Sequence, residues 1–259
     1  MIKPAQSAAP ALERGLAVLD YLAQPQARTL GASVAELRRA LRVPVMSLYR
    51  IVRILEERGH IRQDRSGRYR LGARQIELGF AARSISPLVQ AALPILREIT
   101  RQTHEMSELA VRAGRWDLMM LETWQAEGTP VRIRSRAGLV FQLSPDTPHG
   151  LCYLSFDGPR VLEEFAAQPA HQDELRRPEN RDVFAARERW RRLGYAWHKK
   201  TGPGDIARVA APVFDPRSSP ARLAATIGIA LDESRLTTLR ATAWGQLLKK
   251  AARELEGKI

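Results

Sequence analysis

Two side chains have the types and the spacing that nucleophilic chemistry would need. Cys152 is the only cysteine, and His149 stands three residues before it, so a helix would place both on one face. No third group that could orient the histidine is apparent. The five histidines are dispersed, and the sequence has no Gly-x-Ser-x-Gly, no Gly-rich loop before Lys-Ser or Lys-Thr, and no Cys-x-x-Cys or His-x-x-x-His pair. We therefore expect no enzyme, no bound metal and no cofactor.

A second kind of chemistry, the recognition of nucleic acid, is suggested by one polar helical face. Apolar residues recur at helical spacing from Leu48 to Leu55 and would face a core. The opposite face then carries side chains that can bind phosphates and base edges. We predict that this face contacts DNA through Met46, Ser47, Tyr49, Arg50 and, a full turn further along, Arg53.

The elements around this face follow the order of a winged helix-turn-helix. Ser33 and Glu36 form a capping box that opens a first helix. Pro44 suits the first turn of the second helix, and Gly59 suits its C-terminal end. Two short strands then flank the loop 64–68, so we expect a β-hairpin whose tip places Arg65 and Arg68 along phosphates.

The charge distribution agrees with this placement. The chain carries a formal net charge of +13. Residues 1–86 hold 15 Lys and Arg against 7 Asp and Glu, whereas residues 87–259 hold 26 against 21. Charge alone does not decide the matter, since most charge runs simply solvate a helical face. Combined with the order of elements, the excess favours double-stranded DNA as the partner.

Length and composition limit the remaining possibilities. At 259 residues the chain exceeds the usual size of one domain, so we expect two cores. No apolar run approaches the roughly 20 residues that span a bilayer, and the N-terminus lacks the apolar segment of a secretory signal. One cysteine excludes an internal disulfide. We expect a cytoplasmic protein without a membrane partner.

Several segments resemble, in order and spacing, the IclR family of bacterial transcriptional regulators. The resemblance covers nearly the whole chain and is carried by ALERGLAVLDYLA, VPVMSLYRIVRILEERGHIR, YRLGARQIELG, RIRSRAGLVFQL, TPHGLCYLSF, RRLGYAWHKKTGPGDIARVAAPVFD and AATIGIAL. Within the family, DTPHGLCYLSF and GDIARVAAPVF look most like regulators of phenylpropionate and related aromatic-acid catabolism.

The resemblance implies an α+β protein of two domains. We expect a winged helix-turn-helix over residues 11–71, a linker helix over 72–86, and a GAF/PAS-like effector-binding and oligomerisation domain over 87–259. Family members pair through the linker helix, so we expect a homodimer or homotetramer on a palindromic operator. Within the second domain, periodicity predicts strands at 106–112, 118–124, 131–136, 209–214 and 224–231 and helices at 88–103, 147–154, 160–167, 182–193 and 237–255.

The resemblance also places an effector pocket. The segment Thr147, Pro148, His149 and Gly150 matches the motif at which a helix N-terminus faces the effector, where a carboxylate is stabilised by unpaired N–H groups. This sequence departs from the family at four further pocket positions, namely His198 or Lys199, Arg208, Gly228 and Ala230. Small residues at the last two would make room for a bulky group, and Arg208 could hold a carboxylate. With Trp197, these positions suggest an aromatic acid of the phenylpropionate, benzoate or phthalate type.

Each of these positions also has a structural alternative. Trp197 would equally suit a hydrophobic core, and Arg208 could pair with Asp205 or another acid. The effector could be an aliphatic organic acid. Two further alternatives are a small hydrolase that uses Cys152, and a sensor module that binds proteins instead of an operator.

Overall fold

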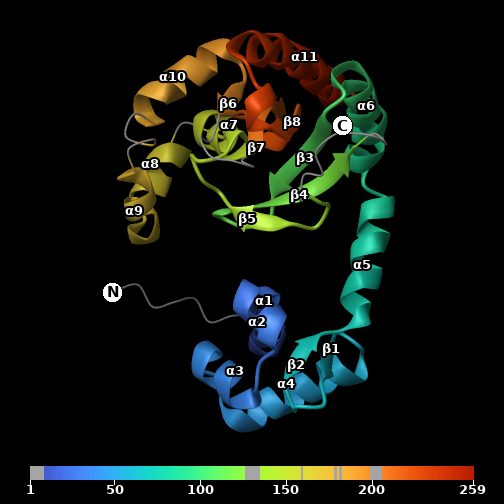
Figure 1. Cartoon of the computed structure of the whole chain (residues 1–259). Coiled ribbons are helices and arrows are strands. Elements are labelled where there is room, and N and C mark those ends of the chain that lie inside the picture. The colour runs from blue at the N-terminus through green and yellow to red at the C-terminus, as the bar shows by residue number, and fades with distance from the viewer. Residues whose placement is uncertain (1–8, 126–134, 159, 178–179, 181–182, 199–205) are drawn as a thin grey trace. The chain divides into compact units, whose positions relative to one another are not determined.

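The computed structural model describes residues 9–125, 135–158, 160–177, 180, 183–198 and 206–259. The chain divides into two compact units, and the boundary lies between Ile85 and Ser86 (Figure 1). Each unit has its own hydrophobic core.

The first unit consists of helices followed by a short hairpin. Its elements are α1 (Pro10–Ala23), α2 (Pro25–Leu30), α3 (Val34–Leu41), α4 (Val45–Glu57), β1 (Ile61–Gln63), β2 (Tyr69–Leu71) and α5 (Ala73–Ser84). β1 and β2 are antiparallel, with Ile61 opposite Leu71. The core comprises apolar residues of α1, α3, α4 and the hairpin, including Leu22, Leu37, Leu48 and Val52. The predicted winged helix-turn-helix is confirmed.

Local sequence explains most of these boundaries. At the start of α3, Ser33 Oγ accepts the Glu36 N–H and the Glu36 carboxylate accepts the Ser33 N–H, as the capping box predicts. Gly59 follows α4 with a φ of +72°. Two predictions need correction. Pro44 is the N-cap of α4 and not its first residue, and α2 was not expected because it has only six residues.

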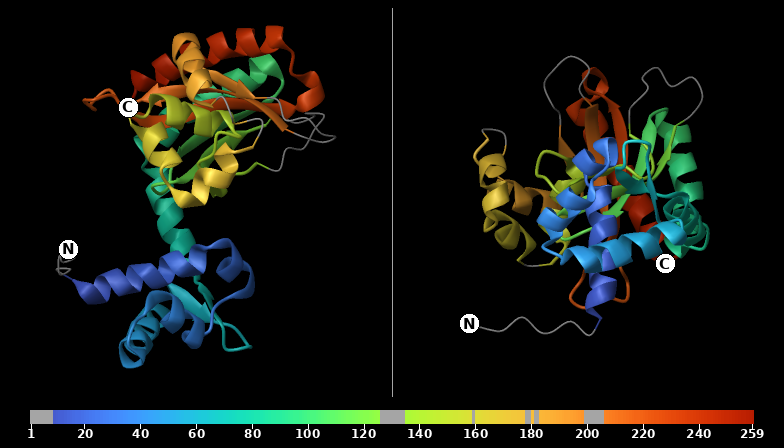
Figure 2. Two further views of the ribbon diagram at one scale, coloured as in Figure 1. Left: turned by 90° about the vertical axis from the view of Figure 1, so that its left-hand side faces the viewer. Right: turned by 90° about the horizontal axis from the view of Figure 1, so that it is seen from below.

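The second unit is a six-stranded antiparallel sheet between helical layers (Figure 2). Its helices are α6 (Pro87–Thr103), α7 (Pro148–Phe156), α8 (Val161–Ala166), α9 (Gln172–Leu175), α10 (Val183–Leu193) and α11 (Thr238–Glu256). Its strands, in spatial order, are β5 (Val140–Gln142), β4 (Asp117–Trp124), β3 (Met106–Arg112), β8 (Leu223–Asp232), β7 (Ile206–Phe214) and β6 (Ala196–His198).

The two faces of this sheet differ in chemistry because side chains alternate along each strand. One face carries Val209, Ile227 and Ile229 and packs against α6 and α11 in the largest hydrophobic core. The other face carries Glu108, Arg208 and Gly228 and faces α7 (Figure 1). The register pairs Glu108 with Gly228 and Arg208 with Ala230, so polar side chains from distant segments share one face.

The strand predictions were partly wrong. The predicted strand at 131–136 falls largely on 126–134, outside the described residues, and 135–136 are not in a strand. The edge next to β4 is formed instead by Val140–Gln142, and Ala196–His198 adds the other edge. Both edge strands have only three residues, too few for an alternation pattern to be read from the sequence.

Candidate functional sites

The outward face of α4 carries the residues that the sequence singles out for DNA contact. Met46 and Tyr49 are 67% and 52% exposed, and Arg50 is exposed too. Ser47 is half-buried. Arg53 pairs with Glu57 at 2.7 Å on the exposed side of the helix. An exposed apolar and aromatic surface next to cationic side chains is what a groove-reading helix presents before it binds.

The two wing arginines differ in their surroundings. Arg65 is exposed in the loop between β1 and β2. The Arg68 side chain points away from the tip of the loop and toward α3. Its guanidinium lies 2.7 Å from the Glu36 carboxylate and donates to the carbonyls of Leu30 and Gly31. The expectation that both arginines lie at the tip is therefore wrong for Arg68, which clamps the hairpin to the start of α3.

Glu36 holds this clamp together. Hydrogen bonds from the Ser33 backbone N–H, from Arg68 and from the Ser33 hydroxyl lower the pKa of Glu36 to about 2. The carboxylate thus caps α3 and anchors the wing at the same time. Arg70 contributes similarly, since it pairs with Asp64 at 2.9 Å and donates to the Thr29 carbonyl.

A cavity of about 190 Å³ lies in the second unit, at the N-terminal end of α7. Its wall is mostly apolar, with a few polar groups at one side, and it is lined by Met120, Ser135, Leu139, Phe141, Thr147, His149 and Arg208. Ser135 Oγ is buried and has no hydrogen-bond partner among the described residues. An apolar enclosure with a small number of convergent polar groups is typical of a small-molecule site.

The polar side of the cavity is organised by Glu108, which is completely buried. Its carboxylate accepts a hydrogen bond from Arg208 Nε at 2.9 Å and from His149 Nε2 at 3.2 Å. Burial by itself would raise the pKa of Glu108, but the nearby Arg208 and His149 outweigh it and bring the pKa well below its usual range. An ionised carboxylate accepts only, so His149 Nε2 carries the proton and Nδ1 faces the Thr226 hydroxyl at 2.8 Å.

This network bears out the structural alternative for Arg208, an ion pair with an acid, and leaves its contact with an effector a prediction. Its described partner is Glu108, whereas Asp205 lies outside the described residues. Nε and Nη2 are used by Glu108, and Nη1 has no hydrogen bond among the described residues. The guanidinium is therefore both a structural partner and a cavity-lining group with one nitrogen left to donate.

Gly228 does not enlarge the cavity for a ligand, contrary to the expectation. A Cβ at this position would lie 2.8 Å from His149 Cε1 and 3.0 Å from the Val209 carbonyl oxygen. The imidazole occupies the space that glycine leaves free. Ala230 is buried against Met106 and does not line the cavity.

The remaining predicted pocket residues are divided between the cavity and its surroundings. Thr147 caps α7 by accepting the Gly150 N–H, and a Cβ on Gly150 would overlap the Ser144 carbonyl. Pro148 is the first residue of α7. β6 places His198 beside Arg208 but outside the cavity lining, and Trp197 beside Val209 on the opposite face of the sheet. Trp197 is therefore part of the core packing.

The geometry excludes the alternative of a hydrolase that uses Cys152 as its nucleophile. Cys152 is fully buried, its thiol donates to the Ala210 carbonyl at 3.4 Å, and burial raises its pKa. Both ring nitrogens of His149 face other partners, Thr226 and Glu108. A thiolate nucleophile activated by this histidine is excluded.

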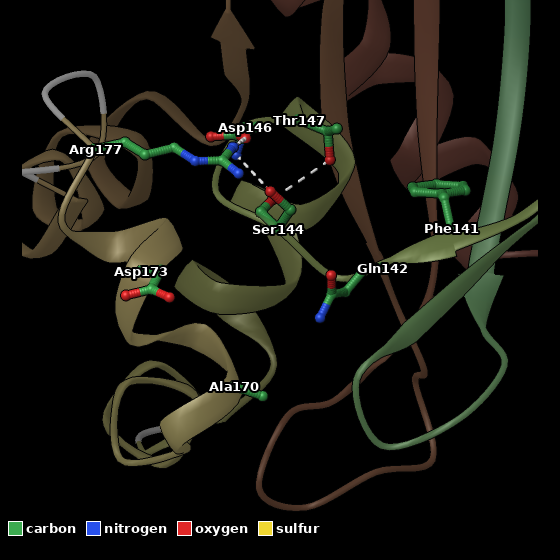
Figure 3. A pocket seen from close by; sticks show the side chains of 8 residues that line it. All are labelled: Phe141, Gln142, Ser144, Asp146, Thr147, Ala170, Asp173 and Arg177. Atoms are coloured by element: carbon green, nitrogen blue, oxygen red, sulfur yellow. Dashed lines mark hydrogen bonds and ion pairs between the residues drawn. The ribbon is translucent and has the colours of Figure 1, made fainter.

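A second hollow, of about 370 Å³, shares Phe141 and Thr147 with the first cavity (Figure 3). Its two acids are paired within the protein. Asp146 accepts from Arg177 and from Asn180 Nδ2 at 2.6 Å each, and Asp173 lies 3.6 Å from Arg176. No charged ligand is needed to balance these side chains.

No group of three or more His, Cys, Asp or Glu side chains among the described residues could hold a metal ion. Likewise, no helix of the described segments is long and apolar enough to cross a membrane.

Comparison with protein families assigns the chain. Residues 80–256 match the family described as "Bacterial transcriptional regulator IclR C-terminal". The chain belongs to the IclR family. It is accordingly a transcriptional regulator and not an enzyme.

IclR relatives extend the similarity over the N-terminal unit. The HTH-type transcriptional repressor AllR of Escherichia coli K12 is 24% identical over 261 residues, which cover 97% of this chain and 90% of AllR. The crystal structure of an IclR transcriptional regulator from Alicyclobacillus acidocaldarius has a TM-score of 0.74 at 23% identity and covers 96% of this chain and 98% of that one.

A further IclR homologue, from Microbacterium hydrocarbonoxydans, was crystallised in complex with 4-hydroxybenzoate. It has a TM-score of 0.68 at 21% identity and covers 96% of this chain and 98% of its own. At this identity the likeness shows a shared fold. Neither it nor the AllR match assigns this chain to the aromatic-acid subgroup, so that finer prediction stays a prediction.

Sequence reasoning missed several residues of the cavity lining and of the polar network beside it. Glu108 and Thr226 stand in apolar strands, and a charged residue within MSELAVR was the available signal. The lining residues Ser135, Leu139 and Phe141 carried no such signal, because only the fold brings them to α7.

Proposed function

We propose that this IclR-family protein is an operator-binding regulator whose affinity for DNA is controlled by an aromatic carboxylate bound in the cavity beside α7. The proposal rests chiefly on one observation: a mostly apolar cavity is bordered by Ser135 Oγ and by Arg208 Nη1, neither of which has a hydrogen-bond partner among the described residues.

The DNA-binding part is supported by the arrangement of the first unit. Arg50, Tyr49 and Met46 extend from α4 into solvent, and Arg65 lies exposed in the wing. Helix residues of this kind contact base edges in the major groove while wing cations contact phosphates. The AllR similarity supports an operator as the partner.

The aromatic carboxylate is supported by the chemistry of the cavity wall. Phe141, Met120 and Leu139 offer apolar contact to a ring, and Arg208 Nη1 and Ser135 Oγ can hydrogen-bond a carboxylate or a ring hydroxyl. The volume of about 190 Å³ suits a single-ring acid better than a larger ligand. The Microbacterium homologue was crystallised with 4-hydroxybenzoate, a single-ring aromatic acid of the class proposed here.

Self-association is supported by α5. None of its residues is buried in the single chain. Two of them, Ile76 and Phe80, are large apolar side chains one turn apart, and each is 63% exposed. Such an apolar face is unfavourable in water. Pairing of two α5 helices would cover it and would place two copies of α4 on a palindromic operator.

The test is selection of duplex DNA by the full-length protein from a random pool, followed by fluorescence anisotropy with the enriched sequence, with and without 4-hydroxybenzoate. We expect an enriched palindrome, an affinity that changes on adding the acid, and at least tenfold weaker binding for Arg50→Ala, a loss of about 1.4 kcal/mol. Lys250→Ala, in the second unit, is the control. Enrichment of no sequence would contradict operator binding and favour the protein-binding alternative.

A further inference from the structure

The second unit has another hollow, of about 310 Å³, which shares no lining residue with the cavity beside α7. It lies where α7 and α10 end against α11 and β7. Four cations line it: Arg191, Arg192, Lys249 and Arg253. Phe156 and Phe214 add an aromatic wall, with ring centroids 6.2 Å apart in an edge-to-face arrangement.

Two of these cations are held in place by neutral groups. Arg191 Nε donates to the Ser155 carbonyl at 2.7 Å, and Lys249 Nζ donates to the Leu193 carbonyl at 2.8 Å. The turn at Gly194, where φ is +75°, leaves room for the lysine, since a Cβ there would lie 2.9 Å from Lys249 Cε. These contacts fix the positions of two positive charges without neutralising them.

The other two cations are not held by such contacts among the described residues. Within the described residues, neither Arg192 nor Arg253 makes a side-chain hydrogen bond or an ion pair. Glu256, the acid in the lining, accepts the Phe214 backbone N–H through Oε1. Glu188 approaches Arg191 only to 3.6 Å and is largely exposed.

The charges do not cancel. The C-terminal ends of α7, α10 and α11 each contribute about half a negative charge, and Glu256 contributes one. Against four cations this leaves roughly one and a half positive charges, or about half of one if Glu188 is counted as well. The remaining positive charge favours an anionic ligand, and two unneutralised guanidinium groups can each hold one anionic group.

We infer that this hollow binds a small organic dianion, a phosphate monoester or a dicarboxylate, whose apolar part packs against Phe156 and Phe214. Arg192 and Arg253 hold the anionic groups, for which the planar guanidinium is suited. The volume of about 310 Å³ lies at the lower end of the range for small-molecule sites. The regulator thus has a second ligand site, of a different charge preference from the first.

The test is isothermal titration calorimetry of the full-length protein with phenyl phosphate and, separately, with phenylsuccinate, both at physiological salt. The test variant is R192Q/R253Q, which removes two exposed side chains that make no hydrogen bond or ion pair in the described part of the chain and should fold normally. The control is R189Q/K250Q, which removes two cations from the same helices outside this hollow.

We expect at least one dianion to bind the wild type and the control equally and to bind R192Q/R253Q about tenfold more weakly or worse. Loss with only one of the two ligands identifies the anion as phosphoryl or carboxylate. Unchanged binding to R192Q/R253Q, equal loss in both double variants, or no binding of either dianion would each overturn the inference.

Discussion

Among single residues, Arg208 has two roles that a substitution can separate. It neutralises the buried Glu108, and it borders the cavity with Nη1, for which the described part of the chain offers no hydrogen-bond partner. Deleting the side chain would leave the buried Glu108 carboxylate without its cationic partner. A loss of ligand affinity in an alanine variant could then come from unfolding or from the lost contact, and the two causes could not be distinguished. Lysine keeps the positive charge but loses the planar guanidinium.

We therefore predict that Arg208→Lys keeps the fold and weakens binding of 4-hydroxybenzoate by about tenfold or more, because one of two hydrogen-bonding edges is lost. Calorimetric titration of the full-length protein measures this, with aliphatic acids titrated in parallel. Undiminished affinity in the lysine variant would remove Arg208 from the proposed effector contacts. A response to aliphatic acids alone would discard the aromatic proposal.

Glu108 provides a prediction about pH. Its folded-state pKa lies well below its usual range, so its ionisation stabilises the protein above about pH 4.3, the unfolded value, and this contribution is lost as the pH falls below it. Glu108→Gln should cost about 3 kcal/mol at pH 7, since it leaves Arg208 without its anionic partner, and should flatten the decline in stability toward low pH.

Urea unfolding followed by tryptophan fluorescence measures this, because all five tryptophans lie between residues 116 and 244, in the second unit. Glu254→Gln, at an exposed ion pair with Lys258, is the control and should change the free energy of unfolding by no more than about 0.5 kcal/mol. Equal acid sensitivity of the Glu108→Gln variant and the wild type would refute the linkage.

At the scale of elements, the wing combines two different functions in neighbouring arginines. Arg68 joins β2 to the capped start of α3, through Glu36 and two backbone carbonyls. Arg65 makes no such contact and remains exposed. The same residue type in one loop therefore serves folding at one position and is available for phosphate at the other.

This division predicts opposite outcomes for two alanine variants. Arg65→Ala should leave stability unchanged and reduce the slope of log affinity against log salt by about one, as the loss of one phosphate contact requires. Arg68→Ala should lower the melting temperature of the first unit and affect DNA binding mainly through that loss. Salt-dependent anisotropy and circular dichroism distinguish them, and an unchanged slope in Arg65→Ala would exclude the phosphate contact.

At the scale of the whole molecule, the proposed function requires that two copies act together. One half-site gives limited affinity, and two linked half-sites give much more. The exposed apolar side chains of α5 would be covered by such a pairing. Effector binding in each second unit could then change the operator affinity of the pair through the differential stability of its states.

We predict that Phe80→Glu shifts the protein toward monomer in sedimentation velocity and weakens operator binding. Ala82→Glu adds the same charge to the same helix, about half a turn away from Phe80, and should leave self-association intact. An oligomeric state unaffected by Phe80→Glu would show that α5 is not the pairing surface.

Features that depend on local chemistry could be predicted from neighbouring residues alone. The capping box at Ser33 and Glu36, the helical spacing of Leu48 to Leu55 and the hairpin around residues 64–68 are short-range patterns, and the structure has each of them. The family resemblance likewise followed from segment order, and the family match confirms it.

The environment of the cavity depends on contacts between distant segments and could not be predicted from local patterns. Glu108 and Arg208 are 100 residues apart in the sequence. The need for glycine at position 228 is explained only by its contact with the His149 ring. Trp197 and Arg208 looked alike as pocket candidates, but strand register puts them on opposite faces of the sheet. Such relations depend on register and packing between distant segments, and a pattern of neighbouring residues contains neither.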